Sequence, residues 1–182
     1  FYAKSKTMAE LAAWEFMEME NPDFSLTVIN PVLVMGPSLS QDVGTSNSLV
    51  KSMISGSVPG TPKIHIGIVD VRDVASAHIL AMESSGADGE RIIVSEKELW
   101  VHEVAAILRD AGFNKTPKIL FPKWLMKIVA LFRKDLALMI PMIGKRRDVS
   151  SSKARSLLGW KPMKAELSII DTAQQLKDFD LL

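Results

Sequence analysis

Hydrophobic and polar positions follow two periods along the chain, and the first two predicted elements show both. Residues 2–19 have a helical period, with Met8, Leu11, Ala12 and Met19 on one side. Asn21-Pro22 ends this helix, because proline cannot continue its hydrogen-bond ladder. Residues 26–35 are β-branched and apolar on both faces, which predicts a strand buried in a parallel sheet, with an irregularity at Pro31.

Further along the chain, helices and strands are predicted to alternate. After a polar loop over residues 38–47, we expect strands at 64–69 and 91–94. The helix at 70–82 is predicted to carry His78 on its inner face and to begin with Asp70 and Asp73 as capping carboxylates. We also expect helices at 49–54, 100–110, 122–132, 136–143, 150–158 and 166–176. This alternation predicts an α/β fold with parallel pairing, although three strands make a thin sheet.

The composition narrows the class of protein. A net charge of +1 over 182 residues gives no field that would favour nucleic acid or an anionic membrane. The absence of cysteine excludes disulfides and thiolate zinc sites, and the three histidines are not spaced as a helical metal pair. No apolar run reaches the roughly 18 residues of a membrane span, and no signal peptide is visible, so we expect a cytoplasmic protein.

Candidate chemistry lies at the beginning of the chain. Tyr2 and Lys6 are four residues apart, so a helix places both side chains on one face. A phenol has an ordinary pKa near 10, and an ammonium group one turn away favours its ionised form. Such a pair can donate a proton to a carbonyl oxygen, although the spacing alone also fits an exposed helix start.

Four segments carry a family resemblance that spans the chain. Residues 2–10 (YAKSKTMAE) and 30–37 (NPVLVMGP) resemble the Tyr-x-x-Ser-Lys-x-x-Ala-Glu and Pro-x-x-Val-x-Gly-Pro motifs of extended short-chain dehydrogenases/reductases. Residues 69–78 (VDVRDVASAH) and 158–162 (LGWKP) resemble two later motifs of the same family. The subgroup that the chain resembles includes dihydroflavonol reductases and bacterial aldehyde reductases.

The resemblance implies roles for individual residues. Tyr2 is implied as the general acid, and Lys6 as the residue that assists it and holds the nicotinamide ribose. Pro31 and Leu33 are implied to lie against the nicotinamide, and Ser46 to approach the cofactor, with Ser48 as its alternative. The substrate would lie between Tyr2 and the loops at 37–48 and 120–143.

The resemblance also implies an architecture. The chain would be the C-terminal half of the enzyme: residues 1–36 and 61–96 belong to a Rossmann-type parallel sheet, and residues 37–60 and 97–182 to a mostly helical substrate-binding subdomain. The glycine-rich pyrophosphate turn and a serine or threonine for the carbonyl oxygen are expected upstream of Phe1, so these residues alone should bind a dinucleotide poorly.

The expected activity is reduction of an aldehyde or ketone on a small apolar, dihydroflavonol-like substrate, with NADP(H) favoured over NAD(H). The helix from Tyr2 is implied to be able to form a homodimer face. Two alternatives stay open: a nucleotide-sugar epimerase or dehydratase on the same fold, and a noncatalytic binding module. The Met- and Leu-rich stretch at 120–143 weighs against the sugar enzymes, which need polar contacts to a diphosphate.

Overall fold

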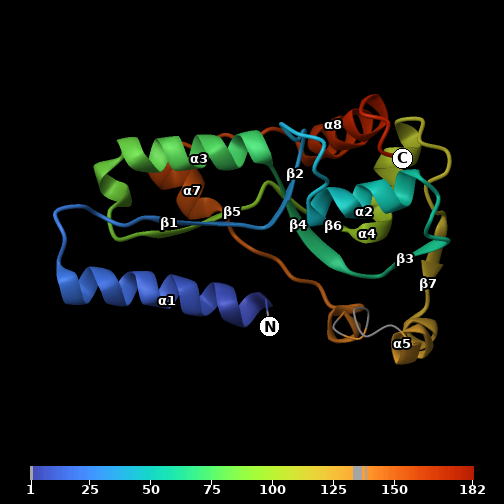
Figure 1. Cartoon of the computed structure of the whole chain (residues 1–182), viewed down its shortest axis with the longest axis horizontal. Coiled ribbons are helices and arrows are strands. Elements are labelled where there is room, and N and C mark those ends of the chain that lie inside the picture. Colours follow the sequence, from blue (N-terminus) through green and yellow to red (C-terminus); the bar gives the residue numbers. More distant parts are fainter. Residues whose placement is uncertain (1, 133–136, 138) are drawn as a thin grey trace.

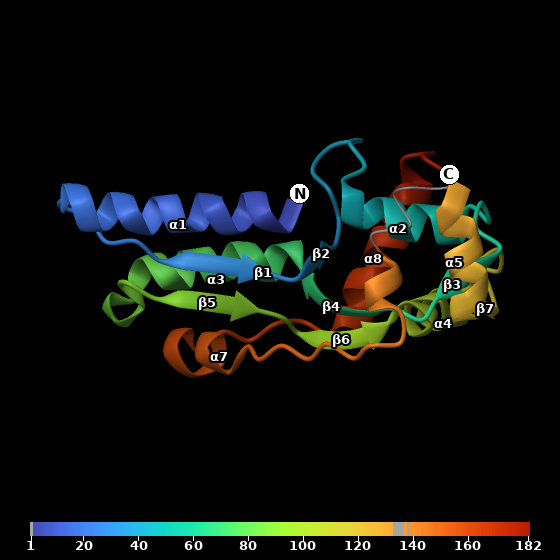
Figure 2. The same cartoon turned by 90° about the horizontal axis from the view of Figure 1, so that it is seen from below.

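The computed structural model describes residues 2–132, 137 and 139–182, and it confirms the predicted α/β fold (Figure 1). Helix α1 (Tyr2–Glu20) lies alongside strand β1 (Val28–Pro31), and its amino-terminal end is level with the junction between β1 and β2 (Leu33–Met35) (Figures 1 and 2). The start of the chain therefore lies level with the point where β1 ends and β2 begins.

The strands form three small sheets. β1 pairs in parallel with β5 (Arg91–Val94), and β2 pairs in parallel with β4 (His65–Asp70). β4 pairs on its other edge with β6 (Lys97–Trp100), and this pair is antiparallel, contrary to the expected parallel pairing. β3 (Gly60–Pro62) and β7 (Ile119–Phe121) form a third, parallel pair. The sequence did not predict β3, β6 or β7.

The predicted irregularity at Pro31 is confirmed. The strand expected over residues 26–35 is divided at Val32, whose N–H still donates to the carbonyl of Val94 at 3.3 Å. Beyond this residue the chain leaves β5 and joins β4. Because proline has no N–H to donate, it is tolerated at the end of β1 but not within a central ladder.

Two apolar clusters hold the fold together. The larger one is buried between β2, β4 and three helices, α2 (Thr45–Ile54), α4 (Val101–Asp110) and α8 (Ala165–Asp178). The smaller one lies between β5, α3 (Val71–Glu83) and α7 (Ser152–Leu158), and contains Trp160. The remaining described elements are α5 (Lys123–Phe132) and two short 3-10 helices, Ser85–Ala87 and Ile140–Met142. Residues 36–44 form the loop between β2 and α2, and α2 begins four residues earlier than predicted.

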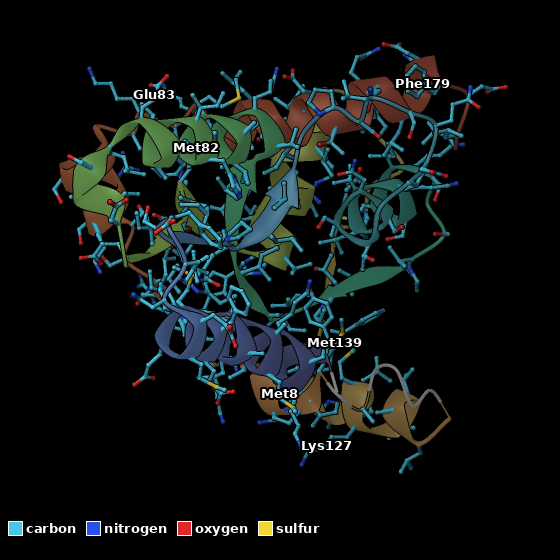
Figure 3. All side chains as sticks on the ribbon, turned by 60° about the vertical axis from the view of Figure 1, so that its left-hand side comes forward. Met8, Met82, Glu83, Lys127, Met139 and Phe179 are labelled. Carbon is cyan, nitrogen blue, oxygen red and sulfur yellow. The ribbon has the colours of Figure 1, made fainter. Side chains whose placement is uncertain are left out.

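The apolar side of α1 that the sequence indicates is not the side that packs against the sheets. Met8, Leu11 and Met19 are 57%, 54% and 79% exposed, and Figure 3 shows Met8 on the side of the helix away from the sheets. The half-buried residues of the helix are Glu10, Ala13, Trp14 and Met17, on the opposite face. Both faces of α1 are rich in apolar residues, so periodicity alone did not identify the packed one.

The predicted inner face of α3 is also wrong. His78 is exposed and its Nδ1 lies 2.8 Å from the carbonyl oxygen of Val74, one turn earlier on the same helix. Ala77 and Ala81 are the buried residues of α3, while Ile79 is 56% exposed. The buried residues of α3 are thus small, Val74 and Leu80 are half-buried against the same cluster, and Ile79 and Met82 face outward.

The predicted helix over residues 136–143 falls partly outside the described residues, and its described part contains the 3-10 helix Ile140–Met142. No helix in the described ranges is long and apolar enough to cross a membrane.

Candidate active site

Tyr2 and Lys6 lie together, as their spacing predicts. The Nζ atom of Lys6 is 5.7 Å from the centroid of the Tyr2 ring, and the tyrosine side chain is 76% exposed. The helix that carries both is tied to β5 by an ion pair between Glu10 and Arg91, with 2.6 Å between Oε1 and Nε. Hydrogen bonding to Arg91 holds the pKa of Glu10 below its ordinary value. Because Tyr2 and Lys6 are both exposed, the phenol and the ammonium group are accessible to a ligand.

Pro31 and Leu33 lie on either side of the residue where the first strand changes partners. Pro31 is the exposed last residue of β1, and Leu33 is the half-buried first residue of β2. The amino-terminal end of α1 is level with this junction in both views (Figures 1 and 2). The structure therefore places these two residues and the Tyr2–Lys6 pair on neighbouring elements.

Ser46 lies in a cavity of about 280 Å³ at the carboxyl ends of β2 and β4. Open α/β sheets bind ligands at this edge. Val34, Met35 and Val71 give the cavity an apolar floor. Its polar lining comes from the loop after β2 and the start of α2, namely Gly36, Pro37, Ser38, Asp42, Gly44, Thr45, Ser46 and Asn47.

Ser48, the alternative to Ser46, is not among the residues that line this cavity. It is exposed, and its Oγ donates to the carbonyl of Gly44 at 3.1 Å, within the first turn of α2. This hydroxyl proton is therefore used within the helix itself.

The stretch at 120–143, expected to wall the same substrate pocket, lines a different cavity of about 290 Å³. That cavity is lined by Lys63, Leu120, Phe121, Pro122, Lys123, Ile143 and Gly144, and it shares no lining residue with the cavity at Ser46. The two loops are therefore not brought together around one described cavity.

The start of α3, beside Val71, is held by a charge network. Asp70 has a fully buried side chain and accepts hydrogen bonds from the backbone N–H and the guanidinium of Arg72, each at 2.8 Å. Burial opposes ionisation of Asp70, but the hydrogen bonds from Arg72 outweigh it and lower the pKa of the carboxyl. The predicted cap at Asp70 is thus confirmed.

Asp73, the second predicted cap, has another role. Its carboxylate accepts from the backbone N–H of Met163 at 2.9 Å, and burial raises its pKa.

Two residues of α8 reach this site from the far end of the chain, and the sequence did not predict them. Thr172 and Gln175 hydrogen-bond the backbone of Gly36 and Ser38, which line the cavity. A signal was present: Ser168, Thr172 and Gln175 recur every three or four residues, among the apolar residues of the packed face. Polar residues on a packed face need buried partners.

No group of three or more potential ligands among the described residues is arranged to hold a metal ion. The Tyr2–Lys6 pair offers a phenol that can donate a proton, with an ammonium group beside its ring.

Comparison with known proteins identifies the family. The chain is 35% identical over 193 residues to the NADPH-dependent methylglyoxal reductase of Saccharomyces cerevisiae, covering 98% of the chain and 51% of that protein. It is also 35% identical over 179 residues to a cinnamoyl-CoA reductase of Medicago truncatula, covering 98% of the chain and 48% of that protein. The chain belongs to the extended short-chain dehydrogenase/reductase family. It spans about half the length of these relatives.

Solved structures of reductases also superpose on this chain. The yeast methylglyoxal/isovaleraldehyde reductase in complex with NADPH superposes with a TM-score of 0.73 at 30% identity, over 98% of this chain and 51% of that one. Vestitone reductase from alfalfa gives a TM-score of 0.72 at 22% identity over 100% of this chain and 53% of that one, which shows the shared fold. No family model matches the chain.

Proposed function

We propose that the protein reduces a carbonyl group with NADPH, and that this chain supplies the proton donor and part of the cofactor site. The observation that carries the proposal is the accessible phenol of Tyr2 with the ammonium group of Lys6 5.7 Å from its ring. Relatives over the whole chain are NADPH-dependent reductases. The earlier assignment of residues 1–36 and 61–96 to a Rossmann-type domain, and of the rest to a substrate subdomain, stays a prediction.

The described residues fit the nicotinamide end of such a cofactor. The exposed amine of Lys6 can donate to ribose hydroxyls, and Pro31 and Leu33 offer an apolar surface at the adjoining strand junction. Ser46 can contact the cofactor from the cavity side. When bound, NADPH supplies the hydride.

Tyr2 then gives its proton to the carbonyl oxygen as negative charge develops there. The positive charge of Lys6 stabilises the phenolate that remains. Lys6 thus acts on the tyrosine and on the ribose with one ammonium group.

We further propose a small, largely apolar aldehyde or ketone as substrate, with its carbonyl at Tyr2 and its body toward the cavity at Ser46. The apolar floor of Val34, Met35 and Val71 supports an apolar body, and the cavity volume of about 280 Å³ supports a small one. The serines and Asn47 on the lining can orient polar substituents. A dihydroflavonol-like ketone fits this description.

The test compares three variants of the protein, purified as its gene encodes it. Tyr2→Phe and Lys6→Met should each lower kcat for carbonyl reduction by about 10²-fold or more, because proton transfer is lost or unassisted. Lys4→Met is the matched control: it removes a lysine two residues away, which helix geometry turns to another side. NADPH oxidation is followed with methylglyoxal, an aromatic aldehyde and a dihydroflavonol, and NADPH binding by fluorescence titration.

Tyr2→Phe should bind NADPH nearly as the wild type does. Undiminished turnover in Tyr2→Phe would contradict the proposed acid. NADPH binding without oxidation in the wild type, with any of these carbonyls, would favour a binding module instead.

A further inference from the structure

The backbone at the start of the loop after β2 is held by side chains of the last helix. The N–H of Gly36 donates to Oγ1 of Thr172 at 2.8 Å, and the N–H of Ser38 donates to Oε1 of Gln175 at 2.5 Å. The Nε2 of Gln175 donates in return to the carbonyl of Ser38, also at 2.5 Å. Pro37 between them has no N–H, so side chains of α8 satisfy both main-chain donors of this three-residue segment.

The other side of the segment is closely packed against the start of α3. Gly36 has φ of +119°, and a Cβ at this position would lie 2.9 Å from Oδ2 of Asp70 and 3.0 Å from Cγ1 of Val71. The guanidinium of Arg72 bonds both Asp70 and Asp171, at 2.8 and 2.7 Å, and so links the start of α3 to α8. The segment is thus fixed between two elements that are themselves tied together.

In the next part of the loop, the backbone N–H groups of Ser40 and Asp42 donate to side chains of the loop itself, Ser38 and Ser40, each at 3.3 Å. Residues 39–42 are exposed, form no helix or strand, and include the fully exposed Leu39. Gly36, Pro37 and Ser38 line the cavity at Ser46 together with this loop. The hydrogen bonds from α8 therefore fix the position of one wall of the cavity, from a helix that supplies none of its lining residues.

We propose that Thr172 and Gln175 are positioning residues for substrate binding. Their hydrogen bonds hold the cavity wall at Gly36–Ser38 in the position that keeps the substrate carbonyl at Tyr2. This inference rests on the proposed function. Neither side chain touches the reacting atoms, so their loss should weaken substrate binding more than it slows the chemical step. Small displacements of a binding wall are enough to cost an order of magnitude or more in efficiency.

Isosteric variants separate positioning from packing. Gln175→Met and Thr172→Val keep the side-chain volume but lose the polar atoms. Each should raise KM for the carbonyl substrate about tenfold, with kcat changed about twofold or less. Gln174→Met is the matched control on the neighbouring residue, whose amide donates to Asp178 on the exposed side of α8. Thr172→Ser keeps the hydroxyl and should keep KM near the wild-type value.

Amide hydrogen exchange gives a second readout that does not depend on turnover. The amide of Ser38 should exchange about tenfold faster in Gln175→Met, and that of Gly36 in Thr172→Val, than in the wild type. Faster exchange together with the rise in KM supports the proposal. Unchanged exchange, or faster exchange with unchanged KM, overturns it.

The wild type separates the two proposals. A wild-type protein without carbonyl reduction overturns the proposed function and this inference together. An active wild type with unaltered kinetics in Gln175→Met and Thr172→Val overturns this inference alone.

Discussion

The indole N–H of Trp160 donates to the backbone carbonyl of Asp73 at 2.9 Å, across 87 residues of sequence. Trp160 is 1% exposed, and it follows Gly159, whose φ of +63° ends α7 in the left-handed conformation. This bond and the burial of the ring fix the turn after α7 against the first turn of α3.

Replacing Trp160 should therefore destabilise the fold strongly. Trp160→Ala is expected to lower the free energy of unfolding by about 3–5 kcal/mol, because a large buried ring and a hydrogen bond are lost. Trp124 is 64% exposed, so Trp124→Ala should cost about 0.5 kcal/mol or less. Chemical denaturation monitored by circular dichroism measures both. Equal losses in the two variants would show that Trp160 is not a core anchor.

Acid should destabilise the protein in part through Asp70. Its pKa in the folded state lies below the ordinary 3.8, because the hydrogen bonds from Arg72 outweigh the effect of burial. A lowered folded pKa means that the carboxylate stabilises the fold above pH 3.8, and that this contribution is lost as pH falls further, through the folded pKa.

Asp70→Asn should lower stability at pH 7 by about 1–3 kcal/mol, since Arg72 loses a charged partner. It should also flatten the decline of stability below pH 4, relative to the wild type. Unfolding free energies measured in urea from about pH 2 to 7 test both effects. Asp178→Asn, on the exposed side of α8, is the control and should keep the wild-type profile. An unaltered acid decline in Asp70→Asn would contradict this account.

The outward face of α1 is expected to form a homodimer interface. Its exposed apolar residues Met8, Leu11, Phe16 and Met19 lie along one side of the helix, opposite the side that meets the sheet. This apolar stripe, which Glu15 interrupts, suits a second copy of the same helix. Leu11→Glu places charge in its centre and should raise the dimer dissociation constant at least tenfold, measured by sedimentation equilibrium. Glu20→Gln, an exposed residue off this stripe, is the control. A wild type that stays monomeric at micromolar concentration would refute the interface.

The sequence predicted the elements well where the local signal was strong. Pro31 divided the first strand, and the Asp70 cap began α3 where it was expected. The sequence did not predict β3, β6 and β7, because each has only three or four residues. Gly60–Pro62 and Lys97–Trp100 also lack an apolar alternation. Strands this short are defined by their partners more than by their own residues.

The packed helix faces and part of the site could not be predicted from the sequence. Met8, Leu11 and Met19 of α1 and Ile79 of α3 are large apolar residues that face outward, so hydrophobic periodicity did not identify the packed faces. Tyr2 and Lys6 meet because four residues make one helical turn, which is local. Gln175 reaches Ser38 only because α8 packs beside the loop after β2, and no local sequence pattern predicts that packing.

Among the described strands, β1 pairs on one edge alone, with β5. Its other edge carries main-chain donors and acceptors that a further extended segment could join, and an open edge pairs with almost any strand that reaches it. Whatever adds to that edge would also limit how far the strand end at Pro31 can shift, and with it the surface that is proposed here to contact the nicotinamide.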